Sequence, residues 1–207
     1  KIIAVPIELL MDSQIDVEAF VRGRMQTRIG RITNQHFTTG TGTGQPRGVV
    51  TGSGAGKVGT TGQTTTVIYD DLVDLQESVD IAYQNGNERF MFRQSMRAVV
   101  RKLKDGSSRP IWTPNYDLGA SAGSPDLLLG TPVVINNDMP APAANAKSIV
   151  FGDLSKYIIR DVMQVSMFRF TDSVYTSKGQ VGFLAWMRAG GNLTDTAAVK
   201  HYQHSAT

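Results

Sequence analysis

The segment DVEAFVRGRMQTRIGRITNQHF, residues 16–37, predicts the longest helix of the chain and so decides how the rest can be arranged. Its apolar residues recur at the three- and four-residue spacing of one helical face. They are Val17, Phe20, Val21, Met25, Ile29 and Ile32. Ser13 and Asp16 stand three residues apart just before this run, in the pattern of a capping box. We therefore expect a helix over about residues 16–37 that buries a single stripe.

The opposite side of this predicted helix is basic. Arg24, Arg28 and Arg31 follow one another at spacings of four and three, which brings their guanidinium groups to one face. Such a face is most often solvated. The alternative is a nucleic-acid-binding module that contacts phosphate groups without reading sequence, and these three arginines are its candidate DNA-facing residues.

Contrasting segments flank the helix. IIAVPI, residues 2–7, is typical of a strand, whereas residues 38–66 are rich in glycine and threonine and favour loops or a short hairpin. The stretch GTGTGQPRGVVTGSGAGKVG, residues 40–59, resembles a phosphate-binding loop only in part. The position five before Gly56 is Thr51, not glycine, and Lys57 is followed by Val58, not serine or threonine. We interpret the stretch as a structural loop.

Two further helices are predicted, over about residues 69–83 and 93–104, with a short strand, ERFMF, between them. The expected inward residues of the first are Leu72, Leu75, Val79 and Ala82, and those of the second are Met96, Val99, Val100 and Leu103. Asp70, Asp71 and Asp74 lie near the positive N-terminal end of the first helix, where acidic side chains are favourable.

The second half of the chain is β-like. After an irregular loop over residues 107–124, short apolar pieces follow one another between turn residues: TPVVIN, SIVF, KYIIRDV, QVSMFRF and QVGFLAWMR. The pattern predicts an α+β fold with helices early and mostly antiparallel strands late.

Composition excludes several functional classes. The chain has 207 residues, of which 41% are hydrophobic, so it can bury one large core or two small ones. It contains no cysteine, which excludes disulfides, thiolate nucleophiles and cysteine-bound zinc. The net charge of +3 is too small to indicate a dedicated nucleic-acid-binding protein. No apolar run approaches the roughly 18 residues that cross a bilayer, so we expect a soluble protein without a membrane partner.

Candidate catalytic motifs are weak. GASAG, residues 119–123, matches the nucleophile elbow of a serine hydrolase with Ser121 as the nucleophile, but its flanks, NYDL and SPDL, are not the buried strand and helix that the elbow needs. His201 and His204 could share a face, yet no third metal ligand lies nearby, and the tail YQHSAT is expected to be solvated. The sequence therefore predicts no enzyme activity, no cofactor, no metal and no small-molecule substrate.

Three consecutive blocks resemble the major capsid protein of tailed bacteriophages of the Hong Kong 97 type. They are TTGTGTGQPRGVV after the long helix, LKDGSSRPIWTP leading to PDLLLGTPVVINNDMP, and FGDLSKYIIRD. The resemblance extends from about Lys1 to Lys200, and it implies a structural protein of a phage or prophage head that assembles with itself into an icosahedral shell.

The resemblance also implies two domains. A peripheral domain would comprise residues 1–50 and 164–195 and include the long "spine" helix of about residues 16–37. An axial domain would comprise residues 51–163 and 196–207, with a mixed sheet and flanking helices, and the glycine-rich segment would join the two on the axial surface. The family's N-terminal arm and extended loop would lie upstream of Lys1.

Partners follow from the same resemblance. They are copies of the chain in pentamers and hexamers, a scaffold, a maturation protease and, without sequence preference, the packaged DNA, with assembly in the bacterial cytoplasm. Some members join subunits by a lysine–asparagine bond that a glutamate promotes. Gly179 and Trp186 stand where the asparagine and glutamate would be, so we expect no self-crosslinking.

Overall fold

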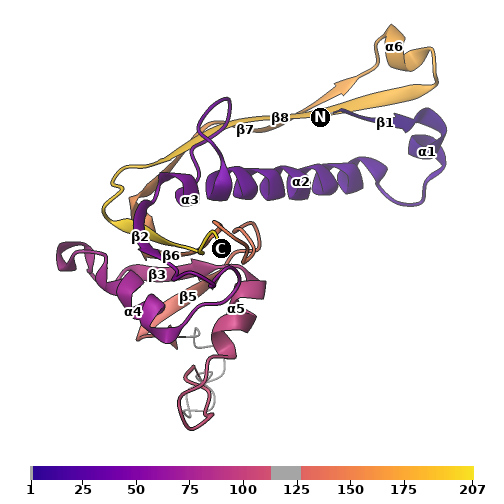
Figure 1. Ribbon diagram of the computed structural model, residues 1–207. Coiled ribbons are helices and arrows are strands. Elements are labelled where there is room, and N and C mark those ends of the chain that lie inside the picture. The colour runs from indigo at the N-terminus through magenta and orange to yellow at the C-terminus, as the bar shows by residue number, and fades with distance from the viewer. Residues whose placement is uncertain (1, 113–126) are drawn as a thin grey trace. The chain divides into compact units, whose positions relative to one another are not determined.

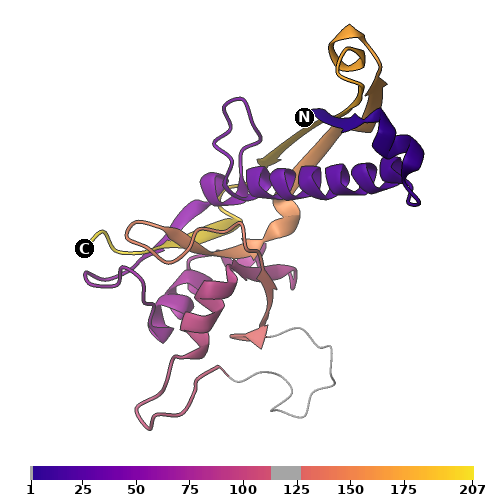
Figure 2. The same ribbon diagram turned by 90° about the vertical axis from the view of Figure 1, so that its right-hand side faces the viewer.

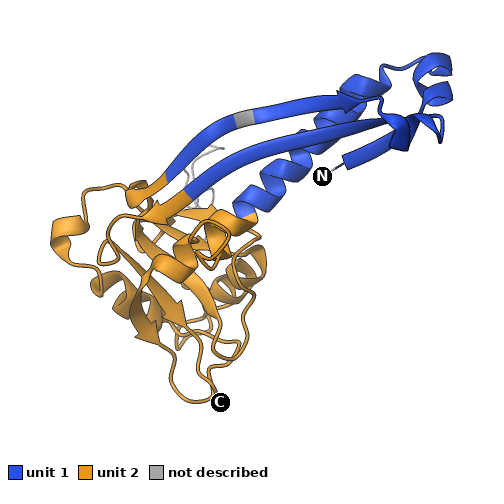
Figure 3. Ribbon diagram, turned by 90° about the horizontal axis from the view of Figure 1, so that it is seen from above, with its two compact units in different colours: residues 1–34, 159–190 blue, residues 35–158, 191–207 orange. Residues whose placement is uncertain are grey.

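The computed structural model describes residues 2–112 and 127–207, which form two compact units (Figures 1 and 3). Unit 1 comprises Lys1–Asn34 and Ile159–Gly190, and unit 2 comprises Gln35–Ile158 and Gly191–Thr207. The α+β fold class is confirmed, with a three-stranded sheet and a six-stranded sheet. Three elements contribute residues to both units: α2 (Val17–Thr39), β7 (Tyr157–Phe170) and β8 (Gln180–Leu193).

The long helix is confirmed as α2, but its cap differs from the prediction. The backbone N–H of Ala19 donates to the Asp16 carboxylate at 2.9 Å, so Asp16 caps the helix. The Ser13 hydroxyl instead accepts from the N–H of Ile15 at 3.2 Å, within the preceding turn. Moving the cap three residues along the chain sets the first helical residue at Val17.

Only part of the predicted apolar stripe of α2 is buried. Val17, Val21 and Met25, at spacings of four, are buried in unit 1. Phe20 and Ile32 are 54% and 49% exposed, so their predicted burial is wrong. Phe20 and Ile32 lie beside the row formed by Val17, Val21 and Met25. The core of unit 1 therefore covers a narrower strip of the helix than the apolar pattern predicts.

In unit 1, α2 packs on the sheet β1-β8-β7, in which β1 (Ile2–Pro6) pairs antiparallel with β8 from Ile2↔Leu184 to Pro6↔Gln180. The short helices α1 (Ile7–Asp12) and α6 (Ser173–Thr176) complete the unit. The core consists of Val5, Val17, Val21, Met25, Val181, Phe183 and Ala185. The predicted pieces KYIIRDV and QVSMFRF form one continuous strand, β7, because no turn residue separates them.

Unit 2 contains the sheet β2-β9-β6-β3-β5-β4. Its strands are β2 (Gly54–Val58), β3 (Glu88–Phe92), β4 (Leu127–Leu128), β5 (Thr131–Ile135), β6 (Lys147–Asp153) and β9 (Val199–Gln203). The pairs β2–β9 and β3–β5 are parallel and the other three are antiparallel, so the sheet is mixed.

The two predicted helices of unit 2 are present but shorter. They are α4 (Tyr69–Glu77), which is followed by the 3-10 turn η1 (Ile81–Tyr83), and α5 (Gln94–Arg101). Ala82 is exposed, contrary to the prediction, because α4 ends before it. Leu154–Lys156 form a second 3-10 turn, η3, before β7.

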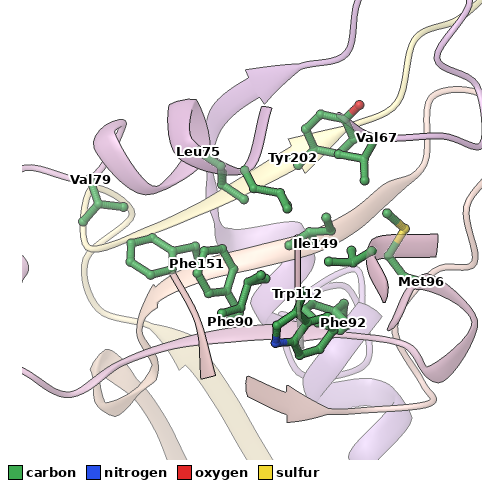
Figure 4. Close-up of a cluster of buried hydrophobic side chains, with 13 residues drawn as sticks. Val67, Leu75, Val79, Phe90, Phe92, Met96, Trp112, Ile149, Phe151 and Tyr202 are labelled. Carbon is green, nitrogen blue, oxygen red and sulfur yellow. The ribbon is translucent and has the colours of Figure 1, made fainter. Parts of the chain in front are cut away.

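The main core of unit 2 lies between these helices and one face of the sheet (Figure 4). Leu72, Leu75 and Val79 come from α4 and the turn after it, and Met96 and Val100 come from α5. They pack with sheet residues that include Phe90, Phe92, Ile149, Phe151 and Tyr202. The Phe90 and Phe151 rings face each other across paired strands, with centroids 4.6 Å apart.

The glycine-rich segment is more ordered than a surface loop. Thr41 and Arg47 form an antiparallel bridge that closes a narrow loop between α2 and α3 (Val49–Gly52), which Figure 2 shows in profile. Val49 and Val50 are buried in a second core with Met91, Met139, Val150, Leu193 and Val199, so this part of the segment lies inside unit 2 and not on its surface.

Candidate functional surfaces

The sequence motifs for small-molecule chemistry do not gather into a site. Across residues 2–112 and 127–207, no three histidine or carboxylate side chains lie where they could hold a metal ion. Ser121 and the GASAG motif lie outside the described residues.

Lys57, the lysine of the incomplete phosphate-loop motif, joins β2 to α4. Its ammonium group donates to the Asp74 carboxylate and lies 3.9 Å from Asp71, and these contacts raise the lysine pKa. A Cβ on Gly56 would lie 2.7 Å from the side chains of both Leu75 and Ser78, so glycine allows this close packing against α4. The motif is thus explained by contacts inside unit 2.

The two C-terminal histidines are buried, and the prediction of a solvated tail is wrong. His201 lies in β9, and its Nδ1 is 2.9 Å from the Ser53 hydroxyl, which itself donates to the Val50 carbonyl oxygen. Burial lowers the His201 pKa to about 4, and the nearby charges of Lys147 and Lys200 act in the same direction. His201 is therefore neutral in the folded protein.

His204 holds the end of the chain against a neighbouring loop and β6. Its Nδ1–H donates to the Gln63 carbonyl oxygen at 3.2 Å, and its Nε2 accepts from the Ser148 hydroxyl at 2.7 Å. Burial lowers its pKa as well. The side chain of Tyr202 is also fully buried, and its hydroxyl lies 3.3 Å from the Gln63 amide oxygen. All three residues therefore serve packing.

The arginine face of α2 is open to solvent. Arg24, Arg28 and Arg31 are all exposed. The Arg24 guanidinium lies 5.0 Å from the centre of the Phe20 ring, which gives the exposed aromatic a partner. Arg22, on another side of the helix, makes an exposed 3.5 Å ion pair with Glu18. The predicted DNA-facing residues thus share one accessible side of a rigid helix.

A groove of about 270 Å³ runs beside α2 within unit 1. It is lined by Arg22, Met25, Gln26, Val165, Met167 and Ala185. The polar side chains of the lining are those of Arg22 and Gln26, and the other four are apolar. They provide no acid–base pair, so the groove has no catalytic constellation.

The sheet of unit 1 has an exposed apolar face, which we call the outer face. On β8, Val181, Phe183 and Ala185 are buried toward α2, so Trp186 points to the other side, where it is 54% exposed. Val162 and Phe168 of the edge strand β7 alternate to the same side and are also exposed. Large exposed apolar residues on an edge strand are typical of surfaces that another protein chain covers.

The residues aligned with the family's crosslink lie just before the start of β8 and within it. Gly179 has φ +62° and precedes β8, and its carbonyl oxygen accepts from the N–H of Ile7 at 2.8 Å. Trp186 belongs to the outer face. The absence of a crosslink stays a prediction. Within residues 2–112 and 127–207, no helix combines the length and apolarity required to cross a bilayer.

Comparison with known proteins gives full-length structural matches. The chain is 30% identical to a chain of the capsid of an empty GTA particle computed with C5 symmetry, and the match covers 100% of this chain and 72% of that one with a TM-score of 0.85. Gordonia phage Cozz gives 14% identity, 100% and 69% coverage and a TM-score of 0.72. A chain of the holo-SrpI encapsulin complex from Synechococcus elongatus PCC 7942 is 13% identical, and the match covers 100% of this chain and 73% of that one with a TM-score of 0.66. At such low identity, the phage Cozz and encapsulin matches show the fold alone. None of the curated proteins compared with the chain matches it.

The fold and these comparisons define a structural protein with the Hong Kong 97-type capsid fold. The model of the phage capsid family matches residues 1–204. The chain belongs to the phage capsid family. It is a component of the virion capsid and not an enzyme, as the sequence predicted.

Sequence reasoning did not identify the outer face, although a signal was present. KYIIRDVMQVSMFRF has apolar residues at both even and odd positions, which is the pattern of a strand covered on both faces. The pattern was missed because the segment was divided into two short predicted strands, KYIIRDV and QVSMFRF.

Proposed function

We propose that this chain is the major head protein of a tailed double-stranded DNA phage or prophage and that its copies associate into the pentamers and hexamers of an icosahedral shell. The observation that carries the proposal is the match over the whole chain, at 30% identity, to a capsid chain solved within a particle. The outer face, with Val162, Phe168 and Trp186 exposed, supports the proposal because it offers apolar side chains for another copy to cover.

Assembly is the direct test of this function. The full-length protein, examined by electron microscopy and analytical ultracentrifugation, is expected to form pentamers, hexamers or closed shells. Trp186→Ser is expected to weaken assembly while leaving the unfolding of the isolated subunit nearly unchanged, because Trp186 is exposed in the single chain. A wild-type protein that stays monomeric at high concentration would contradict the proposal.

We further propose that unit 1 corresponds to the peripheral domain and unit 2 to the axial domain. Support comes from the placement of most of α2 and the β7–β8 pair in unit 1, and of the six-stranded sheet in unit 2. A scaffold, a maturation protease and assembly in the bacterial cytoplasm remain part of the proposal, and they rest on the family resemblance alone.

The arginine face of α2 is proposed to attract packaged DNA without sequence preference. Three exposed guanidinium groups on one side of a rigid helix favour this contact. Replacing Arg24, Arg28 and Arg31 by glutamine is expected to reduce the slope of log affinity against log salt by about 2 to 3, because each phosphate contact contributes about 0.9. The measurement is a salt titration of duplex binding by the full chain.

The control for this test removes the same number of exposed charges from the same unit. It replaces Arg160, Arg169 and Lys178 by glutamine. An equal loss of slope in both variants would mean that net charge alone matters, and preferential binding to one DNA sequence would also contradict the proposal.

A further inference from the structure

Two stretches of unit 2 carry opposite charge. Residues 69–80, which contain α4, hold five acidic and no basic residues. Residues 93–109, which contain α5, hold six basic residues and one acidic residue, Asp105. The whole chain has 21 basic and 18 acidic residues, a net charge of +3, so charges of −5 and +5 in two short stretches are a strong local separation.

The acidic stretch is only partly neutralised within the chain. Lys57 binds Asp74, and the buried Asp71 accepts from the N–H of Ile68 at 3.2 Å in the cap of α4. Asp70, Glu77 and Asp80 are exposed, and no salt bridge involves them within the part of the chain that the structure describes. We call these three residues the acidic face.

The basic stretch is exposed at the end of α5 and in the turn after it. Its one acid, Asp105, is occupied, because its carboxylate accepts from the N–H groups of Ser107 and Arg109 at 2.9 and 2.8 Å. Lys102, Lys104 and Arg109 are exposed, and none of them forms a salt bridge with another described residue. We call these three residues the basic face.

Helix electrostatics inside one chain account for only part of this distribution, because Asp70 lies in the first turn of α4, Asp80 caps η1 and Lys102 is the C-cap of α5. Acidic side chains stabilise the N-terminal end of a helix and destabilise the C-terminal end, and basic side chains do the reverse. Glu77 is the last residue of α4, and Arg93 is the N-cap of α5, so both stand at the unfavourable end. A partner of opposite charge would remove this cost.

The two faces belong to helices that lie over different parts of the six-stranded sheet. α4 contacts β2, β9 and β6, which form one side of the strand order. α5 follows β3, and its N-terminal N–H donates to Asn137, just beyond β5, on the other side of the order. Figure 4 shows Val79, beyond α4, and Met96 of α5 at opposite sides of the shared core. Within one chain the faces therefore do not neutralise each other.

We propose that the acidic face of one copy of this chain binds the basic face of a second copy. The inference rests on the proposed self-association and specifies its contact. Since the two faces are different surfaces, the contact is head-to-tail, and a head-to-tail contact forms a ring when the rotation between copies closes and an open filament when it does not. The charge match fixes the direction in which subunits follow one another and disfavours like-to-like pairing.

A charge-exchange experiment on the full chain tests this contact. Asp70→Lys with Glu77→Lys reverses the acidic face, and Lys102→Glu with Lys104→Glu reverses the basic face. Each reversal alone is expected to weaken association by about tenfold or more, because like charges then oppose each other. Combining both reversals is expected to restore association, since the pairing is the same with the signs exchanged. Ultracentrifugation and electron microscopy measure the oligomers.

Two controls separate this contact from other effects. Glu8→Lys with Asp12→Lys reverses the same number of exposed acids on α1 in unit 1 and is expected to leave ring formation unchanged. Circular dichroism and thermal unfolding of each subunit verify that the variants fold, because all substituted residues are exposed in the single chain.

The outcomes are distinct. Wild-type association by a singly reversed variant overturns the inference and leaves the proposed function standing. Failure of the combined variant to recover, together with loss of duplex binding by the basic-face variant, also overturns it and identifies residues 93–109 as a polyanion surface. A wild-type chain that never associates removes the proposed function itself.

Discussion

Acid sensitivity of unit 2 follows from the buried histidine of β9. His201 is 4% exposed and has a pKa of about 4 in the folded protein, against an ordinary value of 6.5. The unfolded chain therefore binds a proton that the folded chain excludes, and stability falls as the pH drops from about 6.5 to about 4. Between about pH 8 and about pH 5 this single group costs about 2 kcal/mol.

The assay is urea unfolding at the two pH values, followed by tryptophan fluorescence. The chain has two tryptophans, so a Trp186→Phe background leaves Trp112, which is buried in the core of unit 2, as the reporter. His201→Asn in this background keeps an N–H donor for the Ser53 hydroxyl and removes the titrating ring. It is expected to be less stable at the higher pH and to lose about 2 kcal/mol less on acidification than the parent.

His204 provides the internal comparison, because burial lowers its pKa in the same direction. Both histidines are expected to contribute, so the double variant should show the flattest dependence on pH. The reasoning would be refuted if His201→Asn lost as much stability between the two pH values as its parent, within about 0.5 kcal/mol, the usual limit of additivity between such measurements.

Two further predictions concern packing in unit 2, measured by urea unfolding. Phe151→Ala is expected to lower the free energy of unfolding by about 3–5 kcal/mol because it opens a cavity beside Phe90. Phe168→Ala, on the exposed outer face, should change the free energy of unfolding of the single subunit by less than about 1 kcal/mol. Equal costs for the two variants would contradict the assigned burial. Gly152→Ala is expected to destabilise by more than about 2 kcal/mol, since the residue has φ +140° and the new Cβ would lie 2.1 Å from the Ala198 carbonyl oxygen. Gly190→Ala, with no neighbour within 4 Å, is the matched control, and similar stability of the two variants would refute the packing argument.

The sequence was sufficient to predict the elements whose residues follow a local periodic pattern. Residues 16–37 carry a periodic apolar stripe and form α2, and ERFMF forms β3 between two helices. The three arginines of α2 were found because helical spacing alone brings them to one face. These features need no knowledge of distant segments.

The errors arose where distant segments decide the structure. GAGKV in the glycine-rich stretch becomes a strand only because it pairs with β9, far along the chain. VKHYQ lacks an apolar run, and its His201 and the nearby His204 are buried with Ser53 and Ser148 as their hydrogen-bond partners. The charge separation between α4 and α5 was visible in the sequence, but its meaning depends on where the sheet places the two helices.

β9 is the last strand of the chain order and lies between β2 and β6 in the six-stranded sheet. During synthesis, β2 and β6 both leave the ribosome well before residues 199–203. They therefore cannot yet pair with β9, the strand that joins them in the sheet. Contacts between segments so distant in sequence slow folding. The subunit therefore completes this six-stranded sheet only after residues 199–203 have been translated, and until then β2 and β6 have no strand between them.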